Sequence, residues 1–217
     1  MSRAARVSGG VSADASADAA AVSVVAPAES VSVVSPRPMR ADARRNYERI
    51  LTVARQAFLD HGADASLDEI ARRAEVGAGT LYRHFPNRSA LLDAVYRDYV
   101  QGISDKADEL SATLPPGEAF TEWVRYLAGS MCRNHGLKDA TLAENLDLTA
   151  CRELYHKAGA SLLTAAQEVG AVRAGIDLND VFKFVHATTL GSENSPDPQA
   201  QIDRLLPIVF DGLRGRG

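Results

Sequence analysis

The chain has 217 residues, of which 46% are hydrophobic and 24% charged, and it carries a net charge of −4 at neutral pH. These proportions fit a soluble globular protein of one or two domains, and no apolar run reaches the roughly 18 residues that a membrane-spanning helix needs. The charge is unevenly divided: residues 40–101 carry ten Arg against nine acidic residues, and residues 102–217 carry eleven basic against sixteen acidic residues. The acidic excess therefore does not exclude a polyanionic partner for residues 40–101.

Residues 1–39 are rich in Ala, Ser and Val, with three prolines and no aromatic residue. This composition predicts a disordered N-terminal tail. The stretch Ala19–Ala28 has the apolar character of a signal-peptide core, but Asp14 and Asp18 precede it where positive charge is expected. We therefore expect a tail and not a targeting segment. The sequence leaves open whether translation starts at the first residue or at Met39.

The rest of the chain is predicted to be all-α, because no segment shows sustained period-two alternation of apolar residues. The first helix ends at His61-Gly62. Its apolar side chains share one face at helical spacing and are Tyr47, Ile50, Leu51, Ala54, Ala57 and Phe58.

The run Ser66–Phe85 predicts two short helices joined by a glycine-containing turn. Ser66 and Glu69 have the spacing of a capping box at the start of the first helix. The second helix is expected to turn Leu81 and Phe85 inward. Its outward side chains are then Thr80, Tyr82, Arg83 and His84. A compact helix pair that exposes hydroxyl, guanidinium and imidazole groups on one face suits the DNA major groove.

In this context, residues 40–99 resemble the DNA-binding domain of the tetracycline-repressor (TetR) family of bacterial regulators. The resemblance extends from the first helix through the stretch Gly79–Arg88 to the apolar pair Leu91-Leu92. Two positions depart from the family pattern. Glu75 stands where the family often has Gly, which costs roughly 1 kcal/mol if that residue is left-handed. Arg88 replaces the usual Lys, which keeps the charge but changes the contact geometry.

The resemblance implies a three-helix DNA-binding domain at residues 40–100 that reads double-stranded operator DNA. Arg83 is the best candidate for a base contact, and Tyr82 and His84 are implied to bind phosphate. Alternatively, Tyr82 packs on the first helix, and Arg44 and Arg45 belong to a solvated face. The predicted DNA-binding residues are Arg40, Arg44, Arg45, Ser66, Gly77, Ala78, Gly79, Thr80, Tyr82, Arg83, His84 and Arg88.

Asn87 is expected to cap a long helix that ends near Pro115 and links this domain to a second helical domain at residues 101–217. The next predicted helix runs through Phe120 and Met131 and is broken around His135-Gly136. The remaining helices are predicted from apolar spacing and from cap and turn residues. They span residues 138–147, 149–169, 178–190 and 198–213.

By resemblance, the second domain binds a small molecule and forms a homodimer. The effector is expected to be partly apolar. The candidate ligand-binding residues, each of which could instead be plain core, are Trp123, Leu127, Met131, Leu142, Leu154 and Phe184. His135, His156 and His186 could add polarity to the cavity, but their spacing does not match a metal site.

The dimer interface is predicted on the last two helices, because apolar side chains cover more than half of the helix at 178–190. The alternative is a central helix that is buried within a monomer. The predicted interface residues are Val181, Phe182, Val185, Ile202, Leu206, Val209 and Phe210.

The sequence thus predicts a ligand-responsive transcriptional regulator, a repressor, that binds a palindromic operator as a cytoplasmic homodimer. No nucleophile–base pair, phosphate-binding loop or metal cluster is evident, so we expect neither enzymatic activity nor a cofactor, and no membrane partner. The alternative is a helical interaction protein of the same fold without operator binding. Glu75 is the one feature that favours it.

Overall fold

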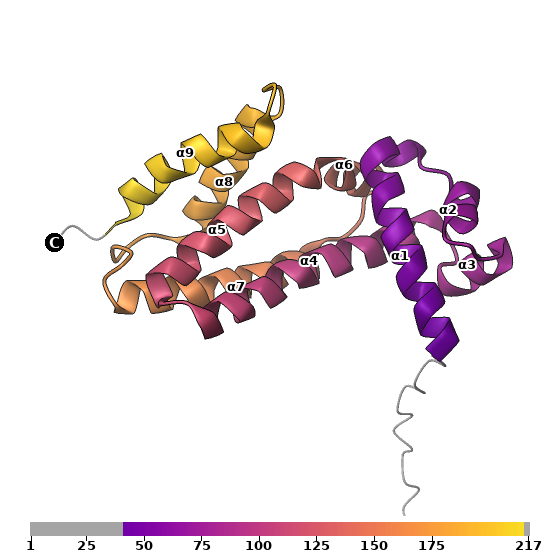
Figure 1. The fold of residues 1–217 in the computed structure, drawn as a ribbon, viewed down its shortest axis with the longest axis horizontal. Coiled ribbons are helices and arrows are strands. Elements are labelled where there is room, and N and C mark those ends of the chain that lie inside the picture. The colour runs from indigo at the N-terminus through magenta and orange to yellow at the C-terminus, as the bar shows by residue number, and fades with distance from the viewer. Residues whose placement is uncertain (1–40, 215–217) are drawn as a thin grey trace, which may run out of the picture. The chain divides into compact units, whose positions relative to one another are not determined.

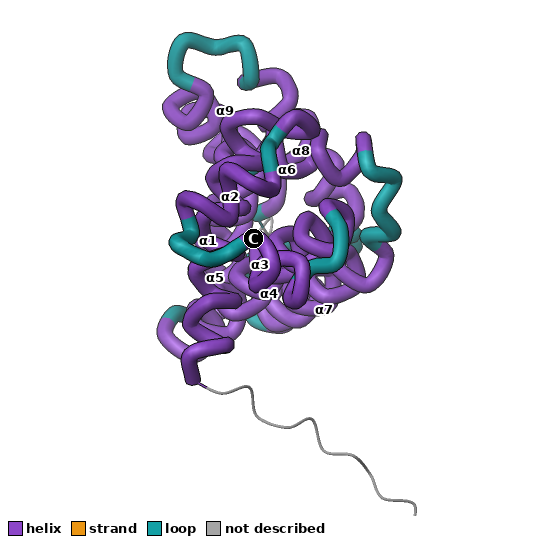
Figure 2. The backbone as a smooth tube through the Cα atoms, turned by 90° about the vertical axis from the view of Figure 1, so that its right-hand side faces the viewer, coloured by secondary structure: helices purple, strands orange, loops and turns teal. Residues whose placement is uncertain are grey.

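The computed structural model describes residues 41–214, and its regular structure consists of nine α-helices and one short 3-10 helix. Figure 2 shows helices joined by short loops, without a strand in the described part of the chain. The predicted all-α fold is confirmed. The predicted tail, residues 1–39, and the predicted DNA contact Arg40 lie outside the described residues. None of the described helices is both long and apolar enough to cross a bilayer.

The N-terminal helices pack against one another and against the start of α4 (Figure 1). They are α1 (Ala41–His61), η1 (Gly62–Asp64), α2 (Leu67–Arg73), α3 (Ala78–His84) and α4 (Arg88–Thr113). Their shared core contains Ile50, Phe58, Ile70, Leu81 and Leu91, all of which are almost completely buried. This core holds α2 and α3 at a defined angle to α1.

Polar cap residues set the predicted helix starts. The side chain of Asn87 accepts a hydrogen bond from the Ala90 amide at 2.8 Å, and Asp197 accepts one from the Ala200 amide at 3.0 Å. Ser66 accepts from the Glu69 amide at 3.4 Å, which is half of the predicted capping box. The other half differs from the prediction, because the Glu69 carboxylate bonds to the guanidinium of Arg72.

The C-terminal helices pack around α4, which runs without a break across the predicted domain boundary at residue 100. They are α5 (Pro116–Arg133), α6 (His135–Ala143), α7 (Thr149–Glu168), α8 (Leu178–Ser192) and α9 (Pro198–Leu213). Trp123 of α5 is fully buried between α4 and α7. Its indole N–H donates to the Ile103 carbonyl at 3.1 Å, and a Cβ on Gly159 would lie 2.5 Å from its ring.

The predicted helix break around His135-Gly136 is confirmed, although it falls at the preceding residue. The break falls at Asn134, and α6 begins at His135 with Gly136 in its first turn. A Cβ on Gly136 would lie 2.8 Å from the carbonyl oxygen of Leu59, so glycine at this position lets the backbone of α6 contact α1. The helix ends at Ala143, before the predicted residue 147, and Asn145 follows with a left-handed φ of 51°.

Candidate nucleic-acid interface

The turn between α2 and α3 contains a strained residue. Glu75 has a φ of 53°, in the left-handed region that favours glycine. Arg49 of α1 contacts this residue twice: its Nη1 lies 3.1 Å from the Glu75 carboxylate, and its Nη2 donates to the Glu75 carbonyl at 3.4 Å. The Val76 amide closes the turn by donating to the Ala71 carbonyl at 3.0 Å. The turn therefore forms around glutamate without loss of its backbone hydrogen bonds.

Replacing Glu75 by Gly and by Ala is expected to separate strain from ion pairing. Both variants lose the exposed Arg49 ion pair, which contributes about 0.2–1 kcal/mol. Only Gly relieves the left-handed backbone, by roughly 1 kcal/mol. Urea denaturation is therefore expected to show Glu75→Gly about 1 kcal/mol more stable than Glu75→Ala. Equal stabilities would contradict a strained turn at this residue.

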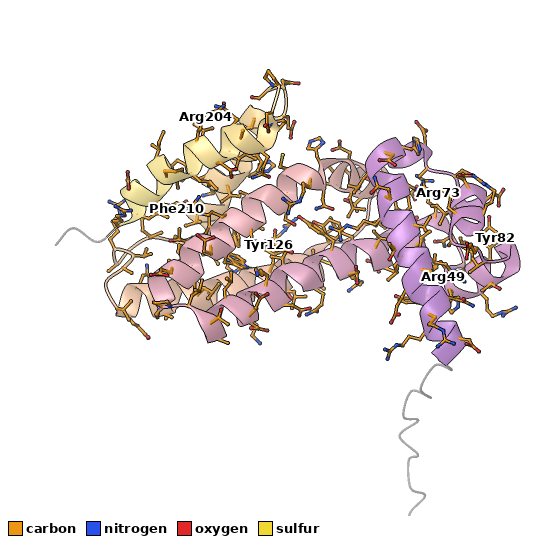
Figure 3. All side chains as sticks on the ribbon, in the orientation of Figure 1. Arg49, Arg73, Tyr82, Tyr126, Arg204 and Phe210 are labelled. Carbon is orange, nitrogen blue, oxygen red and sulfur yellow. The ribbon has the colours of Figure 1, made fainter. Side chains whose placement is uncertain are left out.

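Helix α3 exposes one face and buries the other. Leu81 and Phe85 are buried, and the Tyr47 ring stacks on Phe85 with centroids 5.2 Å apart. Tyr82 is 46% exposed and points away from the core, as Figure 3 shows. Arg83 is also exposed. The buried and exposed sides of α3 thus agree with the prediction. Tyr82 does not adopt the alternative position, packed on α1.

Two other α3 residues, Thr80 and His84, are only half-exposed. The His84 imidazole lies edge-on to the Tyr47 ring, with centroids 5.9 Å apart. Ser66 is exposed and occupies the N-cap of α2. Each of these side chains lies at or near the surface formed by α2 and α3, and their contacts with DNA stay predictions.

At the start of α3 the backbone is accessible, because the side chains there are small or absent. Gly77, Ala78 and Gly79 are all exposed. A Cβ on Gly77 or Gly79 would meet no atom within 4 Å, and neither glycine has a left-handed φ. Packing within the monomer therefore does not require glycine at either position. Small residues here allow a duplex to approach the backbone closely.

Most arginines near this surface are already paired. Arg44 lies 3.1 Å from Glu48, Arg45 pairs with Asp42, and Arg72 lies 2.6 Å from Glu69. These exposed pairs are weak enough to exchange for phosphate. Among residues 41–214, Arg83 and Arg73 are exposed and take part in no ion pair within 4.0 Å. Sequence reasoning missed Arg73, which lies at the end of α2 near Arg49 (Figure 3).

Arg88 is a structural residue, which corrects the prediction that it is free to contact phosphate. Its guanidinium donates to the carbonyls of Ala65 and Gly62, and it lies over the Phe58 ring at 5.1 Å. Its Nε lies 3.2 Å from the Glu144 carboxylate of α6, an ion pair without hydrogen-bond alignment. Because these contacts engage both terminal nitrogens and one face of a half-buried guanidinium, we propose no phosphate contact for Arg88.

A second candidate site is a partly open cavity of about 460 Å³ lined by residues of α4 to α8. Leu127, Met131 and Leu142 line it, as the sequence predicted for ligand-binding residues. Trp123 does not line it but lies behind Phe182, with ring centroids 6.1 Å apart. Leu154 lies outside the lining, packed against the core.

Several lining residues of this cavity were missed. Tyr96 and Tyr99 of α4, Tyr155 of α7 and Phe182 of α8 supply its aromatic wall. Sequence reasoning assigned Phe182 to the dimer interface, because periodicity shows that a side chain points inward but not toward which neighbour. The aromatic pair Tyr96 and Tyr99 on the predicted linking helix was the available signal.

The structure places most of the predicted dimer residues in the core of the monomer. Val181, Val185, Ile202, Leu206 and Phe210 are all buried among α5, α8 and α9, and Val209 is half-buried beside them. The guanidinium of Arg125 covers the Phe210 ring at 5.1 Å. The prediction is therefore wrong for the five buried residues, whereas Val209 lines the groove between α8 and α9 and stays a predicted interface residue.

A different set of small and apolar side chains is exposed on the same two helices. Phe184, predicted as a ligand contact, is 58% exposed, and Ile208 is 69% exposed. Both line a shallow apolar groove of about 230 Å³ between α8 and α9. The exposed surface continues beyond this groove at helical spacing, and we call it the α8–α9 outer face. It consists of Phe184, Ala187, Gly191, Ile208 and Gly212. A Cβ on either glycine would meet nothing within 4 Å, so monomer packing requires neither of them.

Comparisons with known proteins agree along the whole described chain. Residues 50–95 match a family profile described as bacterial regulatory proteins of the tetR family. Residues 115–215 match the C-terminal domain of SbtR-like transcriptional regulators. A TetR transcriptional regulator of Streptomyces coelicolor is 39% identical, with a TM-score of 0.69 over 79% of this chain and 99% of that one.

Two further relatives are similar over different extents. A TetR regulatory protein of Mycobacterium vanbaalenii is 38% identical, with a TM-score of 0.67 over 82% of this chain and 99% of that one. An HTH-type transcriptional regulator of Staphylococcus aureus (strain USA300) is 43% identical over 54 residues, which are 24% of this chain. That match spans only 29% of the curated relative's length.

Proposed function

The chain belongs to the TetR family of transcriptional regulators, and we propose from this premise that it is a homodimeric repressor released from its operator by a small molecule. The proposal rests above all on the surface of α2 and α3, where bare backbone at Gly77–Gly79 adjoins the unpaired guanidinium of Arg83. Exposed residues of this kind suit groove entry and base readout. The protein would act in the cytoplasm, where its operator lies.

Contacts between α6 and the N-terminal helices support the proposed release. Glu144 of α6 pairs with Arg88 and accepts a hydrogen bond from Ser89 at 2.5 Å. Asn134, just before α6, accepts from the Arg55 guanidinium at 2.9 Å. Because α6 also lines the cavity, an occupant that displaces this helix shifts α1 and α4. In a dimer, half-sites about 34–36 Å apart must be matched, so such a shift weakens operator binding.

Selection of bound sequences from a random DNA library, using the purified full-length protein, tests this function. The expected result is enrichment of a palindrome whose two half-sites are about one helical turn apart. Failure to enrich any sequence would favour the alternative of a helical interaction protein. The structure offers that alternative little support, because Arg49 stabilises the turn at Glu75 that first suggested it.

Replacing Gly79 by Ala is expected to raise stability while it weakens DNA binding. Alanine in a helix is favoured over glycine by about 0.5–1 kcal/mol, and its Cβ meets open space in the monomer. A methyl group inserted into a close protein–DNA contact costs about 1–3 kcal/mol, roughly a 5- to 150-fold loss of operator affinity.

The matched control is Gly102→Ala on α4, where a Cβ likewise meets no atom within 4 Å. This variant is expected to gain similar stability without any change in operator affinity. Denaturation and fluorescence anisotropy with labelled operator measure the two effects. Unchanged affinity in Gly79→Ala would show that DNA does not approach the start of α3.

A further inference from the structure

The cavity in the C-terminal domain has an apolar interior and a basic rim. Its interior is formed by side chains such as Ile103, Leu127 and Phe182. Three cationic side chains line it as well, namely Lys138, Arg152 and Lys183. Among the described residues that line it, none is Asp or Glu. The lining therefore combines apolar surface with an excess of positive charge.

Two of the three cations lack a carboxylate partner within the described chain. Lys183 lies 3.0 Å from Asp180, one turn earlier on α8, in an exposed ion pair. Lys138 of α6 and Arg152 of α7 take part in no ion pair within 4.0 Å among residues 41–214. Lys138 is half-buried, and removing an unpaired ammonium from water costs free energy that an anionic ligand can offset.

The tyrosines of the cavity add hydrogen-bond donors. Burial raises the pKa of Tyr99 to about 12 and also raises the pKa of Tyr96 and of Tyr155. These phenols consequently remain protonated at physiological pH and can donate to a ligand. One of the few acceptors, the side-chain oxygen of Asn179, lies 3.1 Å from the His156 ring nitrogen and is already engaged. The cavity thus offers mainly donors and positive charge.

Resting on the proposed function, we infer that the effector is an anionic amphiphile, a small apolar molecule that carries one carboxylate. Its apolar part would occupy the space beside Ile103, Leu127 and Phe182. Its carboxylate would lie between Lys138 and Arg152. The volume of about 460 Å³ is within the range of small-molecule sites, roughly 300–1,000 Å³. A cationic molecule of the same shape would meet uncompensated positive charge.

Three ligands of equal chain length test the inference: decanoate, 1-decanol and decyltrimethylammonium, each below its aggregation concentration. Calorimetric titration of the full-length protein is expected to show decanoate binding at least tenfold more tightly than decanol. The cation is expected to bind most weakly. The fluorescence of Trp123, the single tryptophan of the chain, is expected to change on binding because its ring contacts Phe182 at the cavity.

The double variant Lys138→Gln with Arg152→Gln is expected to lose at least tenfold in decanoate affinity and less than threefold in decanol affinity. Lys157→Gln is the matched control, because Lys157 is exposed on α7 and does not line the cavity. It is expected to bind all three ligands like the wild type. Thermal unfolding of each variant checks that the fold is retained.

Equal affinity for decanoate and decanol, tighter binding of the cation, or no binding of any of the three would each overturn the inference. Operator binding measured in parallel separates this result from the proposed function. A protein that binds its operator but none of the ligands retains the DNA-binding function and loses only the inferred effector class. Preferential decanoate binding without loss of operator affinity supports the effector class and overturns the proposed release.

Discussion

A chain that carries Phe184→Glu and Ile208→Glu is expected to fold normally, to become monomeric and to lose operator affinity by about 10²–10⁴. Both side chains are more than half exposed on the α8–α9 outer face, so glutamate costs the monomer little. In a two-fold interface, each substitution is present twice and places four carboxylates in an apolar contact. A monomer binds only one half-site and loses the avidity of the pair.

Sedimentation measures the assembly, and far-ultraviolet circular dichroism measures the fold. The matched control is Val169→Glu, which changes an equally exposed apolar side chain that lies outside α8 and α9. It is expected to remain dimeric. Leu206→Glu, at a buried site, is expected to unfold the chain instead. A dimeric Phe184→Glu/Ile208→Glu protein would place the interface elsewhere.

Arg88→Ala is expected to lower the stability of the protein, whereas Arg83→Ala is expected to weaken operator binding. Arg88→Ala is expected to lower the free energy of unfolding by about 2–4 kcal/mol, because two backbone carbonyls lose a charged donor and Glu144 loses its ion-pair partner. Arg83→Ala, at an exposed and unpaired side chain, is expected to leave stability unchanged. It should lose about 1–3 kcal/mol of operator binding and relax preference at one position per half-site.

Urea denaturation and operator binding at several salt concentrations distinguish these outcomes. Arg88→Lys is the informative control, because it keeps the charge but cannot donate to Gly62 and Ala65 in the same forked geometry. Its stability is expected to lie between those of Arg88→Ala and the wild type. If Arg88→Ala has wild-type stability and a reduced salt slope of operator binding, then Arg88 contacts phosphate after all.

Features that depend on neighbouring residues along the chain could be predicted from the sequence. Caps at Ser66, Asn87 and Asp197 start helices where the pattern predicted them, because an oxygen acceptor three residues before an unpaired amide acts locally. The inward position of Leu81 and Phe85 follows from helical periodicity alone. The family resemblance rested on such local patterns in their correct order.

The surface that each side chain contacts depends on the packing of helices that are distant in the sequence. Periodicity turned Leu206 and Phe182 inward, but packing placed Leu206 in the monomer core and Phe182 at the cavity. The sequence placed Gly136 near a helix break but did not reveal that its backbone packs closely against α1. An arginine side chain such as that of Arg88 is long enough to reach either solvent or a backbone carbonyl. For Arg88 the acceptors are carbonyls 23 and 26 residues away in the chain. Burial and long-range polar contacts arise from residues distant in sequence, so no local pattern can specify them.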